Sequence, residues 1–190
     1  MRELSLHLMD IIQNSVKAGA HRIEVVLEAD PVRDRIFIRI SDNGCGMSPE
    51  LLQRVTDPFF TTRKTRSVGL GIPLFKEQCE ITGGYLELHS EVGKGTTVEA
   101  VLGLSSIDRL PLGNVSETIT TLIQSDPSID YDLVLVAPGR RFELDLAEIR
   151  KQMDDVPLNE PSVLTWLGQY IAEQQEYIFG GVLHEIISRA

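Results

Sequence analysis

The chain has 190 residues, of which 42% are hydrophobic, and its formal net charge at neutral pH is −10. This length supports one sizeable core and a small extra module. We expect a cytoplasmic protein, because no apolar run reaches the roughly 18 residues of a membrane span and the N-terminus does not read as a signal peptide. The two cysteines, Cys45 and Cys79, lack CxxC spacing, which argues against a zinc site or a disulfide scaffold.

The first predicted element is an amphipathic helix over residues 3–18. Its buried stripe comprises Leu4, Leu8, Ile11 and Ser15. Another face carries Asp10, Asn14 and Lys17, which are spaced to lie together. An amide oxygen can bind Mg²⁺, a lysine can neutralise phosphate, and an aspartate can activate a water molecule. The solvent-exposed face of an ordinary amphipathic helix fits the same pattern. The choice between a binding face and an exposed face therefore depends on the other motifs.

A second motif follows a predicted strand over residues 35–40. Asp42 leaves this strand and is followed by Gly44 and Gly46, just before a helix that starts near Ser48. A carboxylate at this point can accept a hydrogen bond from an exocyclic amine, and glycines allow a flat base to approach the backbone. A simple strand–turn–helix corner also favours these residue types.

A basic loop without apolar periodicity is predicted between Phe59 and a helix over residues 70–82. Its basic residues are Arg63, Lys64 and Arg66. The loop ends in Gly69 and Gly71, and the free N–H groups of the helix that follows would suit a phosphate. The loop would then close over the phosphate as a lid. An exposed basic loop would have the same composition.

A third glycine motif, Gly93–Thr97, joins predicted strands over residues 85–90 and 97–102. It is not a P-loop, because Leu88 occupies the position of the first P-loop glycine. The two earlier glycine pairs do not complete GxGxxG either, since the third glycine is missing in both. The sequence therefore excludes the P-loop and Rossmann modes of nucleotide binding.

In this order the motifs resemble the N, G1, F, G2 and G3 boxes of the GHKL superfamily. That superfamily comprises gyrase, heat-shock chaperone, histidine kinase and mismatch-repair ATPases. The matching segments are Asp10–Lys17, Asp42–Gly46, Asp57–Phe60, Gly69–Gly71 and Gly93–Thr97. They cover residues 3–104 and most resemble the histidine-kinase branch. The resemblance implies an α/β (α+β) two-layer sandwich with helices over a mixed β-sheet, the Bergerat-type ATP-binding fold.

The resemblance also implies roles for single residues in binding ATP and Mg²⁺. Asp42 would accept a hydrogen bond from the adenine amine, Asn14 would hold Mg²⁺ against the triphosphate, and Lys17 would contact phosphate. Thr97 would place a hydroxyl near the adenine. Asp10 occupies the position of a catalytic glutamate in gyrase-like members, and its shorter side chain predicts slow hydrolysis. The remaining nucleotide contacts are expected from Gly44, Gly46, Phe59, Arg63, Lys64, Gly69 and Gly71.

The composition changes after residue 104. Residues 1–104 carry 12 basic and 14 acidic residues, whereas residues 105–190 carry 6 and 14. We expect a linker over residues 105–113 and a small acidic α+β appendage of unknown role over residues 114–190. Its predicted helices and strands are 115–124, 131–136, 141–144, 145–153, 161–178 and 182–188. The charge disfavours nucleic acid, so we expect this part either to bind a protein partner or another copy, or to cover the ATP-binding sandwich.

Within the appendage, Trp166 and Tyr170 are predicted to belong to the core. Asn114 and Glu117 have the spacing of a capping box at the start of a helix.

Three functions fit these features. The first is a stand-alone histidine-kinase-like Mg-ATP-binding protein that hydrolyses ATP slowly or phosphorylates a partner. The second is a nucleotide-gated binding protein without catalysis, and the third is an anti-sigma-type serine kinase. We expect no phosphoacceptor hairpin, because the first helix already carries the N box. His7 is expected to be an ordinary residue of that helix.

Overall fold

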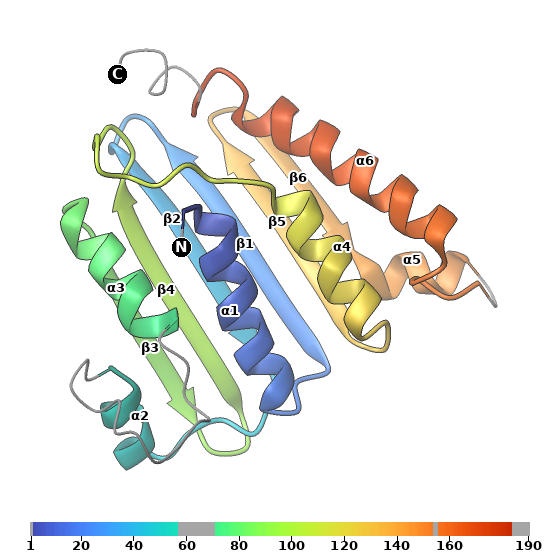
Figure 1. Cartoon of the computed structure of the whole chain (residues 1–190), viewed down its shortest axis with the longest axis horizontal. Helices are drawn as coiled ribbons and strands as arrows, with labels where there is room; N and C mark the ends of the chain where they lie inside the picture. Colours follow the sequence, from blue (N-terminus) through green and yellow to red (C-terminus); the bar gives the residue numbers. More distant parts are fainter. Residues whose placement is uncertain (1, 57–70, 154–155, 184–190) are drawn as a thin grey trace.

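The computed structural model describes residues 2–56, 71–153 and 156–183 of the chain. Its strands form one mixed six-stranded sheet in the order β3-β4-β2-β1-β5-β6 (Figure 1). All neighbouring strands are antiparallel except β1 and β5, which are parallel. The strands are β1 Arg22–Asp30, β2 Arg35–Asp42, β3 Tyr85–Glu91, β4 Gly95–Gly103, β5 Asp130–Ala137 and β6 Arg140–Asp145. The predicted α/β class is confirmed.

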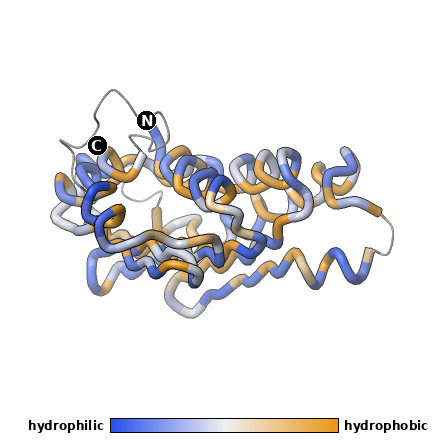
Figure 2. The backbone as a smooth tube through the Cα atoms, turned by 90° about the horizontal axis from the view of Figure 1, so that it is seen from below, coloured by the Kyte–Doolittle hydropathy of each residue, from blue (hydrophilic) through white to orange (hydrophobic). Residues whose placement is uncertain are grey.

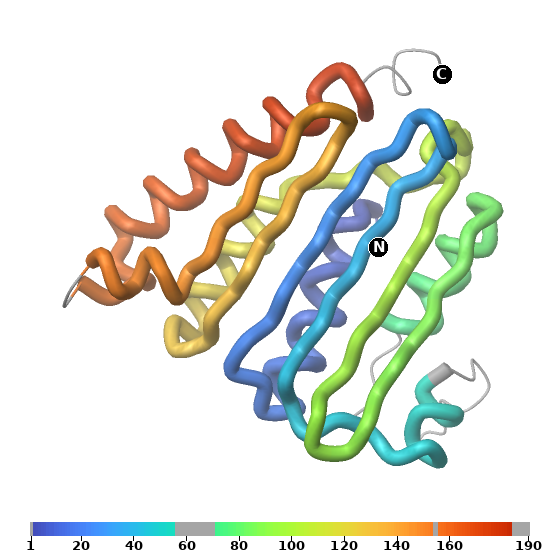
Figure 3. Tube along the Cα trace, turned by 180° about the vertical axis from the view of Figure 1, so that it is seen from behind, coloured from blue at the N-terminus to red at the C-terminus, as the bar shows by residue number. Residues whose placement is uncertain are grey.

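The helices gather on one side of this sheet, and the opposite face carries none of the described helices (Figures 2 and 3). They are α1 Leu4–Lys17, α2 Pro49–Thr56, α3 Gly71–Ile81, α4 Val115–Ser125, α5 Leu146–Gln152 and α6 Pro161–Phe179. Among the described residues, no helix has the length and apolar character needed to cross a bilayer.

The alternation of side chains along each strand explains this arrangement. In β1, Ile23, Val25, Leu27 and Ala29 are buried, and the residues between them are partly exposed. Side chains alternate between the two faces of a strand, so these four residues all point to the same side. The buried residues of the strands and of the helices join in one hydrophobic core.

Helix α1 lies at the centre of the covered face, between the predicted ATP-binding part and the C-terminal part of the chain. Its predicted apolar stripe is buried, as expected. At its start, the backbone N–H groups of Leu4 and Ser5 donate to the carbonyl oxygens of Pro111 and Leu112, at 2.9 and 2.8 Å. Glu3 makes no side-chain capping hydrogen bond there. Because unpaired N–H groups at a helix start need acceptors, the segment before α4 caps α1.

The C-terminal strands continue the sheet of the first half. Strand β5 pairs with β1 in register from Arg22 opposite Asp130 to Glu28 opposite Val136. In place of an appendage beyond a linker, the structure has one sheet and one core. The change in composition at residue 105 therefore does not coincide with a break in packing. Strand pairing between residues about a hundred positions apart leaves no local signal in the sequence.

The helix starts in this half follow the sequence closely. The side chain of Asn114 accepts from the N–H of Glu117 at 2.9 Å, so the predicted cap is present. Asp145 caps α5 in the same way, accepting from the N–H of Glu148 at 3.0 Å. These side chains accept hydrogen bonds from backbone N–H groups of the first helical turn that would otherwise have no partner.

The prediction for Trp166 is wrong. Its side chain is 49% exposed and stacks on Tyr170, with ring centroids 5.7 Å apart. Tyr170 is half-buried and also packs edge-on against Phe142. On α6, the buried face is made by aliphatic residues such as Leu167 and Ile171.

His7 is buried in the core beside α3. Its ring stacks on Phe75 with a centroid distance of 4.9 Å. Burial, opposed by Asp10, lowers the pKa of His7 from 6.5 to about 4. The imidazole is therefore neutral at neutral pH. An enclosed ring does not suit a phosphoryl acceptor, in agreement with its expected role as a helix residue.

The continuous sheet predicts the outcome of truncation. A chain that ends at residue 110 would uncover the β1 edge and the side of α1 that α4 contacts, and it would remove the cap of α1. We expect this fragment to aggregate or to melt without cooperativity, as judged by light scattering and circular dichroism. A chain ending at residue 183, which retains every described element, is the matched control. A monodisperse, cooperatively melting fragment of residues 1–110 would show that the two halves are independent.

Candidate functional site

A cavity of about 720 Å³ opens at one end of the sheet. It lies between α1, the segment that follows β2, helix α2, the start of α3 and strand β4. Its lining residues are Ile11, Asn14, Ser15, Lys17, Ala18, Asp42, Cys45, Gly46, Met47, Leu51, Val55, Ile72, Thr96 and Val98. The walls are mostly apolar with few polar groups. Such a composition suits a flat, largely apolar ring that needs orientation by one or two hydrogen bonds.

The carboxylate of Asp42 is the most firmly held polar group of this cavity. One oxygen, Oδ1, accepts from the backbone N–H of Gly44 at 2.9 Å and from that of Thr96 at 3.2 Å. The other, Oδ2, accepts from the hydroxyl of Ser15 at 2.6 Å. A carboxylate offers about four acceptor positions, so three protein donors leave room for one donor of a ligand. The predicted acceptor is therefore present and oriented.

Ser15 also lines the cavity, although the sequence did not predict it as a site residue. It was counted only as a member of the buried stripe of α1, and it is indeed buried. Its hydroxyl links α1 to Asp42 and fixes the rotation of the carboxylate. A single hydroxyl within an otherwise apolar stripe was the available signal, because a buried hydroxyl needs a partner.

Asn14 and Lys17 line the cavity as predicted neighbours on α1. Asp10 lies one turn before Asn14 and is not among the lining residues. Its carboxylate packs against the start of α3: a Cβ added to Gly71 would lie 2.1 Å from Asp10 Oδ2. A side chain at position 71 would therefore displace Asp10.

The glycines of the motifs are required by the protein's own backbone. Gly46 has a φ of +65°, and a Cβ there would lie 2.0 Å from the carbonyl oxygen of Glu91. A Cβ added to Gly44 would lie 2.9 Å from the carbonyl oxygen of Ala18. From the sequence, these glycines were expected to allow close approach of a nucleotide. The structure supplies another reason, since larger residues would push apart the segments that form the cavity.

The structure corrects the position of the predicted hydroxyl. Thr97 does not line the cavity; its hydroxyl lies 3.1 Å from that of Ser41, its partner on β2. Thr96 lines the cavity instead, and its hydroxyl lies 2.9 Å from that of Ser90. The sequence could not choose between adjacent threonines, because the face that each occupies depends on the register of β4 against β2.

Four predicted nucleotide contacts lie outside the described residues: Phe59, Arg63, Lys64 and Gly69. The two cysteines differ in their surroundings. Cys45 lines the cavity and is exposed, whereas Cys79 is buried. Burial raises the pKa of the Cys79 thiol to about 12.

Residues 2–106 match the family described as "Histidine kinase-, DNA gyrase B-, and HSP90-like ATPase". The chain belongs to this family. The match covers more than half of the chain and includes every cavity residue named above. The GHKL resemblance inferred from the motifs is therefore confirmed, and with it a histidine-kinase-like ATP-binding domain.

Relatives of known name agree with this membership. A putative sensor protein of Shewanella frigidimarina is 31% identical over 109 residues, which are 56% of this chain and 17% of that protein. Sporulation kinase C of Bacillus subtilis is 31% identical over 104 residues, which are 55% of this chain and 24% of the kinase. The matched segment is thus at most about a quarter of these relatives.

A solved structure shares the fold. The N-terminal domain of a DNA repair protein aligns with a TM-score of 0.51 and 17% sequence identity, over 76% of this chain and 53% of that chain.

The two threonines of this GHKL domain provide a matched test of the site. We expect Thr96→Ala to weaken ATP binding about threefold to tenfold, because it removes one hydroxyl, and the hydrogen bond that goes with it, from the cavity wall. Thr97→Ala should leave the affinity unchanged, since Thr97 does not line the cavity. Isothermal titration calorimetry of both variants measures the difference. The reverse ranking would mean that the nucleotide does not occupy this cavity.

Proposed function

We propose that the protein binds Mg·ATP in this cavity and transfers the γ-phosphoryl group to a partner protein, with slow hydrolysis in the absence of the partner. The observation that carries the proposal is the carboxylate of Asp42, held by three protein donors in an apolar cavity with acceptor capacity left over. The exocyclic amine of adenine is a donor of the required kind, whereas guanine presents an acceptor oxygen to the same position.

The donor groups on α1 fit the rest of the ligand. The amide of Asn14 supplies one hard oxygen, which together with phosphate oxygens and water matches the way Mg²⁺ is usually bound. Lys17, exposed at the cavity, supplies a cation for the phosphates. Mg²⁺, when bound, would offset charge on the triphosphate. The residues present are therefore compatible with Mg·ATP.

The reaction class rests on the named relatives and on Asp10. Several relatives are called sensor kinases, and one is called a sporulation kinase. Asp10 lies beside the start of α3 and away from the cavity lining. The short side chain of Asp10 would hold an attacking water less directly than a glutamate would. Poorer activation of water favours transfer of the phosphoryl group to a partner over fast hydrolysis. The net charge of −10 disfavours nucleic acid as that partner.

A nucleotide-gated binding protein is the second candidate, and α1 favours it. The same helix presents Asn14, Ser15 and Lys17 to the cavity and is capped at its other end by Pro111 and Leu112. A shift of α1 on nucleotide binding would therefore reach the segment that leads into α4.

Nucleotide selectivity tests the role of Asp42. We expect ATP to bind more tightly than GTP, and Asp42→Asn to weaken ATP binding by more than about tenfold, since a hydrogen bond to a charged acceptor contributes roughly 1.5–3 kcal/mol. The ratio of ATP to GTP affinity should fall, because the amide offers a donor to guanine. Asp108→Asn, at an exposed position outside the cavity lining, is the control. An unchanged ratio in Asp42→Asn would refute adenine recognition by this residue.

Turnover tests the reaction class. Wild-type protein and Asp10→Asn are incubated with ATP labelled at the γ-phosphate, with and without cell lysate. We expect slow phosphate release that is lower in Asp10→Asn at nearly unchanged ATP affinity, because Asp10 would act in the reaction rather than in binding. A labelled protein band supports phosphoryl transfer. ATP binding without release or transfer would support the gated binding protein, and equal release by both proteins would exclude Asp10 from the reaction.

A further inference from the structure

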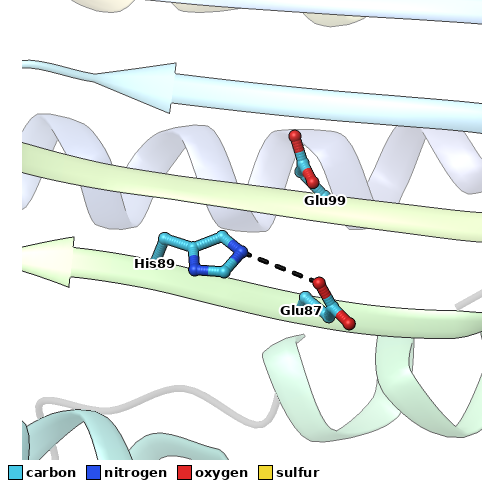
Figure 4. A group of neighbouring side chains, drawn as sticks. All are labelled: Glu87, His89 and Glu99. Atoms are coloured by element: carbon cyan, nitrogen blue, oxygen red, sulfur yellow. Dashed lines mark ion pairs between the residues drawn. The ribbon is translucent and has the colours of Figure 1, made fainter.

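The uncovered face of the sheet carries a cluster of metal-ligating side chains, on the side of the sheet opposite the cavity. Glu87 and His89 are two residues apart on β3 and so point to the same face. Glu99 lies on β4, directly opposite Glu87 in the antiparallel register. Figure 4 shows the three side chains projecting together from the two neighbouring strands.

The spacing of the ligand atoms is close to that of a bound ion. One ligand atom from each residue lies within 4.8 Å of the other two. His89 Nε2 is 3.7 Å from Glu87 Oε2. Bonds of about 2.0–2.2 Å around a tetrahedral ion place the ligand atoms roughly 3.3–3.6 Å apart. The side chains of His89 and Glu87 are 66% and 58% exposed, so small rotations can close the difference.

Within the described part of the chain, the two carboxylates face each other without a lysine or arginine partner. Like charges directly opposite in a sheet destabilise it. Among the described residues, no lysine or arginine forms an ion pair with Glu87 or Glu99. Arg39, the neighbour of Glu99 on β2, binds Glu24 instead, at 2.7 Å. A divalent ion would remove this repulsion.

We propose that Glu87, His89 and Glu99 form a binding site for a divalent transition-metal ion of the Zn²⁺ class. One imidazole nitrogen and two carboxylate oxygens make three protein ligands, and water completes the coordination. The imidazole selects against Mg²⁺, which prefers oxygen ligands and octahedral geometry. The site is separate from the proposed Mg·ATP site, because its residues lie on the opposite face of the sheet from the helices that form the cavity.

Calorimetric titration of the untagged chain with Zn²⁺ tests the proposal. The titrations use a Cys45→Ser background, because the exposed thiol is another Zn²⁺ ligand. We expect one Zn²⁺ per chain, unaffected by excess Mg²⁺. Both His89→Ala and Glu99→Gln should weaken binding by at least about tenfold, since even loss of an outer-shell partner commonly costs that much. His21→Ala, which removes another exposed histidine, should bind Zn²⁺ like the parent.

Thermal melting separates loss of the site from loss of the fold. In EDTA, Glu99→Gln should melt at or above the temperature of the parent, because the like-charge pair is gone. Zn²⁺ should raise the melting temperature of the parent and of His21→Ala but not that of Glu99→Gln. The proposal is overturned if the parent does not bind Zn²⁺. It is equally overturned if Glu99→Gln or His89→Ala binds as tightly as the parent.

Discussion

The carboxylate of Asp42 is the interaction on which the site depends, because it joins three parts of the chain that are distant in sequence. Its donors come from α1, from the turn after β2 and from the start of β4. Each bond satisfies a group that would otherwise be costly to enclose. The carboxylate therefore fixes the cavity's geometry, in addition to being the group that would recognise a base.

The glycines make that convergence possible. Gly95 has a φ of +105°, and a Cβ there would lie 1.9 Å from the carbonyl oxygen of Asp42. Together with Gly46 against Glu91, this shows that the β3–β4 connection is packed directly onto the segment after β2. Substitution of either glycine would move Thr96 and with it one donor of Asp42. The motif glycines thus act on the nucleotide site through the protein backbone.

The sheet separates two surfaces with different chemistry. On the covered side, helices and strands enclose an apolar cavity whose polar groups suit adenine and phosphate. On the bare side, charged residues project from neighbouring strands, among them the Glu87, His89 and Glu99 cluster. Because alternate residues of one strand serve the two faces, Val98 lines the cavity while Glu99 belongs to the cluster. A substitution in β4 therefore affects one surface or the other according to its position.

The sequence by itself determined most local elements, the family and the central residues of the site. Periodicity placed α1 and the strands, a capping pattern placed the start of α4, and ordered motifs identified Asp42, Asn14 and Lys17. These features depend on neighbouring residues, so they can be recognised locally.

Only the tertiary structure decided which faces and segments meet. It brought Ser15 to Asp42, chose Thr96 over Thr97, exposed Trp166, and joined β5 to β1 in one sheet where the composition had indicated a separate appendage. Each of these outcomes depends on strand register or on packing between segments far apart in the chain, and a one-residue change of register would reverse the face of every side chain involved.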